Sequence, residues 1–305
     1  MATEPTLVRA LGDRVSNYRK TAPVFNLIQR PLEVLEQDAL EFGRWFTAGS
    51  GDTGARADLR RDKHSSTALF PNGTTVKPFH GSGAMIASTA LMPAAHLFTQ
   101  TPPKDTLVSR SKDVVHRLGL GQSGGPMERL DFERLWQIKA AGRQQNGKAG
   151  YEVLCRAVGA FRRFVHDLPV LGRASVFVKL AADDVVEAAG SDWRACEERA
   201  FEEAPVIDPF EGASRVVAEL AMAGGRTHAS AEHYDVDFFG LGYVSFPKRR
   251  VQSILQPVYV ALLQPRGWTT FGRIVVVAAT DGAYEPIGRQ LAVPPRPVAA
   301  KPMAR

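Results

Sequence analysis

The chain has 305 residues, of which 44% are hydrophobic and 23% are charged, proportions typical of a folded globular protein. It contains no run of about 18 uncharged apolar residues, which excludes a protein that spans a membrane with helices. Two cysteines, Cys155 and Cys196, are too few for a disulfide scaffold or, alone, for a zinc site. The first residues, MATEPTLVRALGDR, lack the apolar core of a secretory signal. We therefore expect an intracellular, cytoplasmic protein, or a virion protein if the source is viral.

The net charge of +6 is unevenly distributed along the chain. Residues 66–173 and residues 238–305 each carry a net charge of +7, whereas residues 174–237 between them carry −9. Blocks of opposite sign indicate a polyanionic partner for the basic blocks, contacts between the acidic block of one copy and a basic block of another, or neutralisation within one subunit. Position in the sequence leaves these three arrangements open.

Hydrophobic spacing predicts mostly helices between residues 31 and 168. The expected helices are Pro31–Phe46, Gly83–Phe98 with a break at Pro93, Asp105–Leu118, Met127–Arg143 and Lys148–Leu168. The last of these is the clearest, because its apolar side chains recur every three or four residues from Tyr151 to Val165. Residues 48–66, rich in glycine, serine and charge, predict an exposed connection.

After residue 173 the sequence predicts both strands and helices. The expected strands are residues 174–181, short strands within Tyr234–Phe246, and Arg273–Thr280. The expected helices are Asp192–Ala204, Pro209–Ala223 and Val251–Leu263, the last kinked at Pro257. We therefore predict a mainly α protein with a few short strands, a subunit of the helical-assembly type. Its expected parts are an N-terminal helix with a flexible basic loop (residues 1–66), a mainly helical core domain (67–292) and a Pro-rich extended C-terminal arm (293–305).

Several short motifs carry only part of an enzyme signature. GSGDTG at Gly49–Gly54 has dinucleotide-binding spacing, but the required strand before it and helix after it are not predicted. The strings at Gly81–His96 and Gly121–Pro126 resemble trypsin-like serine proteases, which implies His96 as base and Ser123 as nucleophile, although Gln122 replaces the family's acidic residue. KPFHGSG at residues 77–83 is similar to the start of ADP-ribosyl-transferring toxins, whose later motifs we cannot place.

Metal-ligating residues are densest in HASAEH, which holds His228 and His233. These histidines are five positions apart, about 140° around a helix, whereas a helical zinc pair is four apart. Adjacent carboxylates such as Asp183 and Asp184 are typical of a solvated surface. We therefore expect no metal and no cofactor.

Basic residues form the strongest functional pattern. The candidate nucleic-acid-binding residues lie in three groups, Arg60, Arg61 and Lys63, then Arg156, Arg162 and Arg163, then Lys248, Arg249 and Arg250. Binding to a phosphate backbone requires several cations along one surface and no sequence code. We therefore predict a non-enzymatic structural protein that assembles with copies of itself through heterologous contacts and holds RNA or DNA by its backbone, as nucleocapsid or coat proteins do. YDVDFF at Tyr234–Phe239 is weakly similar to a string in coats of flexuous filamentous RNA viruses.

The alternative hypothesis is an intracellular hydrolase or transferase whose site forms only in the folded chain. Its candidate residues are His80, His96 and Ser123. Copurified nucleic acid that a nuclease removes distinguishes the binding protein from the enzyme.

Overall fold

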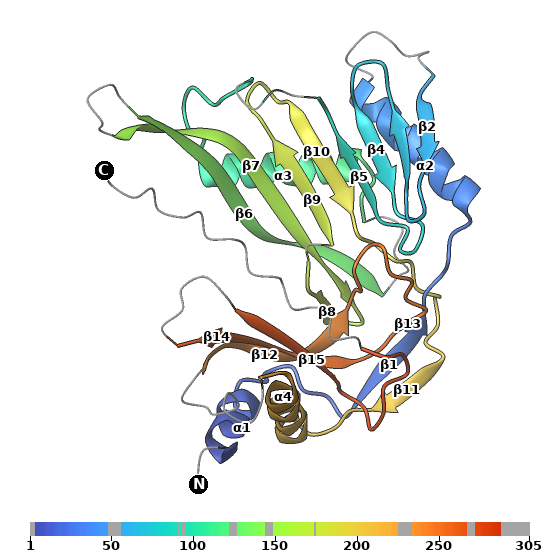
Figure 1. Cartoon of the computed structure of the whole chain (residues 1–305), viewed down its shortest axis with the longest axis vertical. Coiled ribbons are helices and arrows are strands. Elements are labelled where there is room, and N and C mark those ends of the chain that lie inside the picture. Colours follow the sequence, from blue (N-terminus) through green and yellow to red (C-terminus); the bar gives the residue numbers. More distant parts are fainter. Residues whose placement is uncertain are drawn as a thin grey trace. The chain divides into compact units, whose positions relative to one another are not determined.

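The computed structural model describes residues 4–47, 56–90, 92, 95–121, 127–143, 149–173, 175–224, 234–266 and 272–287. Within these ranges the chain forms four helices and fifteen strands (Figure 1). The prediction of a mainly α protein is therefore wrong. The helices are α1 (Glu4–Gly12), α2 (Leu32–Thr47), α3 (Lys104–Arg117) and α4 (Pro209–Gly224). None of these described helices is long and apolar enough to cross a membrane.

The chain divides into two compact units. Unit 1 comprises Met1–Val24, Glu202–Tyr243 and Gln256–Arg305, and unit 2 comprises Phe25–Phe201 and Val244–Leu255. In unit 1, α1 packs on α4, and α4 packs on β15 (Arg273–Ala278). Strand β15 pairs with β14 (Val258–Pro265), and β14 pairs with β12 (Tyr234–Val244). Strand β1 (Thr21–Asn26) pairs with β11 (Glu202–Pro205).

Unit 2 is built on an antiparallel sheet with the strand order β8-β7-β9-β10-β5-β4-β3-β2, and β6 also pairs with β7. Its strands are β2 (Asp58–Arg61), β3 (Ser66–Leu69), β4 (Thr75–Pro78), β5 (Met85–Ser88), β6 (Glu128–Arg143), β7 (Ala149–Val165), β8 (Leu168–Leu171), β9 (Val176–Leu180) and β10 (Val186–Ser191). The two-residue strand β13 (Ile254–Leu255) pairs with the end of β1.

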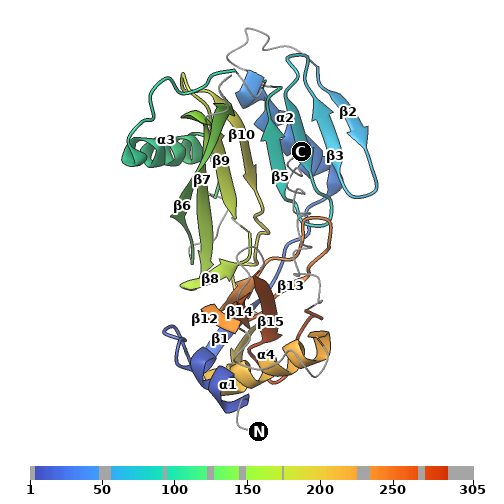
Figure 2. The ribbon, with the colours of Figure 1, turned by 60° about the vertical axis from the view of Figure 1, so that its left-hand side comes forward.

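Helices α2 and α3 pack on the same face of this sheet (Figure 2). Val178, Ala189, Ala87 and Val76 are neighbours across β9, β10, β5 and β4. The first two belong to the core beneath α3, and the last two belong to the core beneath α2. Because side chains alternate along a strand, the residues on either side of these four point to the opposite face.

Five of the predicted helices are wrong. Met127–Arg143 and Lys148–Leu168 correspond to the hairpin β6–β7, and Gly83–Phe98 contains β5. Val251–Leu263 contains β13 and most of β14, and Asp192–Ala204 holds no helix. In β7 an extra residue, Cys155, interrupts the strand alternation. Leu154 and Ala157, three positions apart, therefore face the same core, which produces the helix-like spacing.

Two further predictions are wrong in part. Residues 48–66, expected to be an exposed connection, contain β2, and the short strands expected within Tyr234–Phe246 are the single strand β12. Helices α2, α3 and α4 confirm the predicted Pro31–Phe46, Asp105–Leu118 and Pro209–Ala223, and β9 and β15 confirm the other two predicted strands. The predicted arm (residues 293–305) and the Gly49–Gly54 motif lie outside the described residues.

Candidate functional site

The nine predicted nucleic-acid-binding residues fall into three sets. Five arginines form salt bridges with carboxylates, Arg60 with Asp58, Arg61 with Glu36, Arg156 with Glu187, Arg162 with Glu133 and Arg163 with Glu128. Lys63, Lys248 and Arg249 form no salt bridge with any residue that the structure describes. Arg250 lies over the ring of Phe246 at 4.2 Å. The predicted basic helix face at residues 156–163 does not exist, because this segment is a strand.

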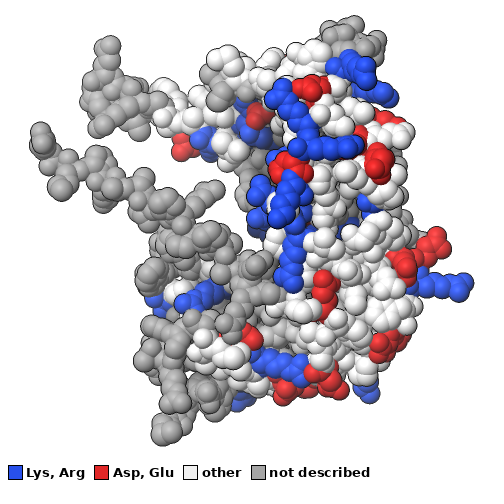
Figure 3. All heavy atoms as spheres, turned by 45° about the vertical axis from the view of Figure 1, so that its right-hand side comes forward, with Lys and Arg blue, Asp and Glu red and all other residues white. Residues whose placement is uncertain are grey.

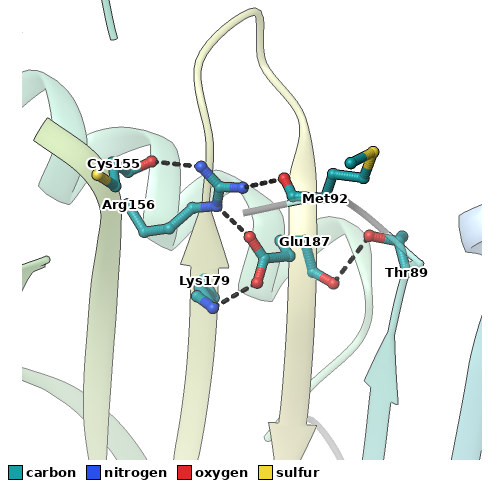
Figure 4. A network of polar contacts seen from close by, with 6 residues as sticks. All are labelled: Thr89, Met92, Cys155, Arg156, Lys179 and Glu187. Atoms are coloured by element: carbon teal, nitrogen blue, oxygen red, sulfur yellow. Dashed lines mark hydrogen bonds and ion pairs between the residues drawn. The ribbon is translucent and has the colours of Figure 1, made fainter. Parts of the chain in front are cut away.

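Arg156 is neutralised on the sheet. Cys155 is an extra residue in β7 beside Arg156, and Glu187 is an extra residue in β10, so both side chains reach toward Lys179 on β9. Glu187 accepts hydrogen bonds from Arg156 and Lys179, and Arg156 also donates to the carbonyl oxygens of Cys155 and Met92 (Figure 4). Burial raises the pKa of Glu187, but the two cations outweigh it and the pKa is lowered. This trio of two cations and one carboxylate retains one positive charge.

Arg162 and Arg163 are bound in different ways. Arg162 and Arg134 both donate to Glu133 at 2.5 Å, a second trio with one excess positive charge. Arg163, only 2% exposed, donates to Glu128 and to the Arg194 carbonyl, and its guanidinium lies 4.5 Å from the Trp193 ring centroid. Arg163 is therefore part of the core.

His80, one of the candidate enzyme residues, joins a buried polar network. Ser66 Oγ donates to Glu36 Oε1 at 2.7 Å, and His80 Nε2 lies 3.0 Å from the same hydroxyl. A hydroxyl has a single proton, so His80 donates to Ser66 and does not serve as its base. Hydrogen bonds from Arg61, the largest effect, and from Ser66 lower the pKa of Glu36 despite its burial. The network attaches α2 to β3.

His96, the second candidate, has an acidic neighbour that the sequence analysis missed. His96 Nδ1 lies 3.1 Å from Asp183 Oδ2. Asp183 and Asp184 have positive φ angles of 55° and 59° as the two central residues of the β9–β10 hairpin turn, a conformation such turns require. Ser123, His228 and His233 lie outside the described residues, and no group of three metal-ligating side chains occurs among those described.

A cavity of about 580 Å³ lies beside α3. Arg110, Asp113, Arg117 and Asp184 line it, and Arg110 Nη2 lies 2.6 Å from Asp184 Oδ1. The two arginines and the two aspartates have opposite charges, so this cavity presents no strong charge to a ligand.

The fold joins two motifs that are far apart in the sequence, KPFHGSG and the Lys248–Arg250 run. A Cβ atom on Gly81 would lie 3.2 Å from backbone atoms of Arg249, Arg250 and Val251, so the two loops are in direct contact. The ammonium groups of Lys77 and Lys248 lie 5.8 and 5.6 Å from the centroid of the Phe79 ring. We call Lys77, Arg173, Lys248 and Arg249 the basic loop cluster.

A buried arginine holds the turn that carries Lys248. Arg194, 5% exposed, donates to the carbonyl oxygens of Phe246, Pro247 and Arg250. Gln252 accepts a hydrogen bond from the Phe246 amide and donates to the carbonyl oxygens of Val244 and Ile254. The chain around Lys248 is therefore fixed by side chains that point away from solvent.

Burial, one carboxylate and one cation act together on Lys248 in the basic loop cluster. Burial lowers the pKa of Lys248, Asp192 raises it, and the positive charge of Arg173 lowers it further, with a net lowering. Burial raises the pKa of Asp192 although Lys248, Arg194 and Arg173 oppose the shift. Lys77, Arg173, Lys248 and Arg249 form no salt bridge within the described part of the chain. Figure 3 shows several Lys and Arg side chains close together on one face of the molecule, with acidic side chains between and beside them.

Sequence inspection identified Lys248 and Arg249 of this cluster but not Lys77 or Arg173. Lys77 was visible only as part of KPFHGSG, whose glycine allows the close approach of the Lys248–Arg250 turn. Arg173 has no neighbouring basic residue in the sequence, so no local pattern marks it.

Comparisons with known proteins give no functional relative. No family model matches the chain, and no curated protein matches it. Among solved structures, the chain is similar to an uncharacterized protein from Eubacterium rectale, with 11% sequence identity and a TM-score of 0.48 over 91% of this chain and 89% of that chain.

Proposed function

We propose that this protein is a non-enzymatic nucleic-acid-binding protein that holds the phosphate backbone through the basic loop cluster. The observation that carries the proposal is that Lys77 and Lys248, neither in a salt bridge with a described residue, share the ring of Phe79. Elsewhere in unit 2, arginines such as Arg156, Arg162 and Arg163 are matched by carboxylates. Asp62 lies near Lys77 and Asp192 lies near Lys248, but neither lysine forms a salt bridge with these carboxylates, so both ammonium groups are available to an external anion.

The crowding of these cations supports a phosphate ligand in particular. Arg173 lies close enough to Lys248 to disfavour its charged form. A phosphate between them replaces repulsion with two attractions, and each contact releases counterions from the nucleic acid. Contacts with phosphates do not read the base sequence, so binding is expected to be similar for unrelated sequences.

The experiment is a salt titration of binding by fluorescence anisotropy, with a labelled oligonucleotide and the Lys77→Gln/Lys248→Gln protein. Loss of two phosphate contacts should reduce the slope of log affinity against log salt by about 1.4 to 1.8, the expected range from single strands to duplex. The matched control is Lys112→Gln, because Lys112 also lies over an aromatic ring, that of Phe132 at 6.0 Å, but belongs to α3.

The proposal is supported if the double variant lowers the slope and the Lys112 variant does not. It is overturned if the wild-type protein does not bind, or if all three proteins bind with the same slope. The same mixtures, analysed on a denaturing gel, should show intact oligonucleotide. Cleavage that His96→Ala abolishes in a folded protein would favour the enzyme hypothesis instead.

A further inference from the structure

The face of the unit 2 sheet opposite α2 and α3 is not covered by any described helix of that unit. Both helices pack on the face that contains Val76 and Val178. Lys77 and Lys179, each next to one of these valines in its strand, therefore lie on the other face. Lys77 thus belongs both to the basic loop cluster and to this open face.

The strand register places two continuous rows of residues across the open face. The first row, from β4 to β6, consists of Lys77, Ile86, Gly190, Phe177, Ala160 and Arg134. The second row, one pleat away, consists of Thr75, Ser88, Ala188, Lys179, Val158 and Trp136. Neighbouring strands are about 4.8 Å apart, so each row spans about 24 Å.

The composition of these rows suits a chain of bases and phosphates. Gly190, Ala188 and Ala160 in the middle of the rows are buried, and Lys77 and Arg134 place a cation at each end of the first row. Trp136 is 45% exposed, and the Arg134 guanidinium lies 5.1 Å from the centroid of its ring. An exposed indole with an adjacent guanidinium is the pairing on which bases of a single strand stack.

The charge of the open face also favours a polyanion. Lys179 belongs to the trio around Glu187, and Arg134 belongs to the trio around Glu133. Each trio retains one positive charge after its internal ion pairs are formed. These two excess charges extend the positive field of the basic loop cluster across the sheet.

We infer that the nucleic acid is single-stranded and crosses this open face from the basic loop cluster to Trp136, with a base stacked on the indole. This inference rests on the proposed function. A duplex keeps its bases paired and stacked inside, so it presents mainly phosphates to the sheet and gains little from Trp136. A single strand exposes base faces, which stack on aromatic side chains whatever their sequence.

The experiment compares a single-stranded oligonucleotide with a duplex of the same sequence. The proteins are the wild type, Trp136→Ala, Trp136→Phe and the Lys77→Gln/Lys248→Gln variant. Trp136→Ala should weaken single-strand binding about 10-fold and leave duplex binding unchanged, and Trp136→Phe should restore most of the loss. The matched control is Tyr151→Ala, because Tyr151 is an aromatic residue of the same hairpin, 91% exposed, and lies outside both rows.

A spectroscopic signal tests the stacking itself. Single-strand binding should quench the tryptophan fluorescence of the wild type, and this quenching should be lost in Trp136→Phe. The inference is overturned if Trp136→Ala binds single strands as tightly as the wild type, or if Tyr151→Ala loses as much affinity. In that case a lowered salt slope in the lysine variant still supports the proposed function. If the lysine variant also binds normally, both proposals are wrong.

Discussion

Arg156 and Glu187 contact each other across the central strand β9 because extra residues displace both strands that flank it. Cys155 is the extra residue in β7, and Glu187 is the extra residue in β10. The Arg156 side chain is only 4% exposed in this salt bridge, whereas the Lys179 side chain, which shares Glu187, is 29% exposed. Arg156, the more buried of the two cations, therefore depends more than Lys179 on Glu187 as its counter-charge.

Glu187→Gln should destabilise the protein more than Arg156→Gln does. Removing the carboxylate leaves a buried guanidinium unpaired, which costs about 3–5 kcal/mol. Removing Arg156 leaves Glu187 paired with Lys179, so the loss should be smaller. The measurement is the free energy of unfolding from urea titrations. Glu152→Gln is the control, because its salt bridge with Lys139 is exposed and should contribute less than about 1 kcal/mol. Equal losses for Glu187→Gln and Arg156→Gln contradict the assigned roles.

Glu36 should make stability depend on pH in the acid range. The carboxyl titrates near 4.5 in the unfolded chain and at a lower pKa in the folded protein, chiefly because Arg61 donates to it. Its stabilisation is complete above pH 4.5 and disappears as the pH falls through the folded pKa. The difference in unfolding free energy between the wild type and Glu36→Gln should therefore shrink on acidification. A difference that stays constant from neutral pH to about pH 3 would show that the ion pair does not perturb this carboxyl.

Gly190→Ala should destabilise unit 2. A Cβ atom at this position would lie 2.6 Å from Phe177 Cε1 and 2.9 Å from the Met85 carbonyl oxygen, and the backbone atom has little freedom to move. We expect a loss of about 1–3 kcal/mol, measured as a lower melting temperature. Gly282→Ala is the control, because nothing lies within 4 Å of its added methyl group. If Gly190→Ala has the same melting temperature as the wild type, the close approach of Phe177 to this position is contradicted.

Self-assembly remains a prediction from the charge blocks. Contact between the acidic block at 174–237 of one copy and a basic block of another uses two different surfaces, and such heterologous contacts form rings or open filaments. Light scattering should therefore show large particles at low salt that disperse as salt screens the attraction. Deleting residues 293–305 should reduce particle size and leave the melting temperature unchanged. A strictly dimeric protein at low salt is incompatible with heterologous assembly.

Local sequence was sufficient for elements whose pattern has one regular period. Helices α2, α3 and α4 each bury one stripe of apolar side chains, and a stripe with a period near 3.6 residues is visible in the sequence. Local sequence was insufficient to predict β7. The bulge at Cys155 places Leu154 and Ala157 on one face, and a strand with such an interruption has the apolar spacing of a helix.

The basic residues show the same limit for the site. The Lys248–Arg250 run and the KPFHGSG motif are both visible in the sequence, but their contact at Gly81 exists only because the folded chain brings the two loops together. Likewise, the sequence shows Arg156 and Arg163 as unpaired basic residues, whereas strand register supplies Glu187 and Glu128 as their partners. Charge composition is a property of the chain, but which charges are neutralised depends on distances of a few ångströms between strands, and those are set by tertiary packing.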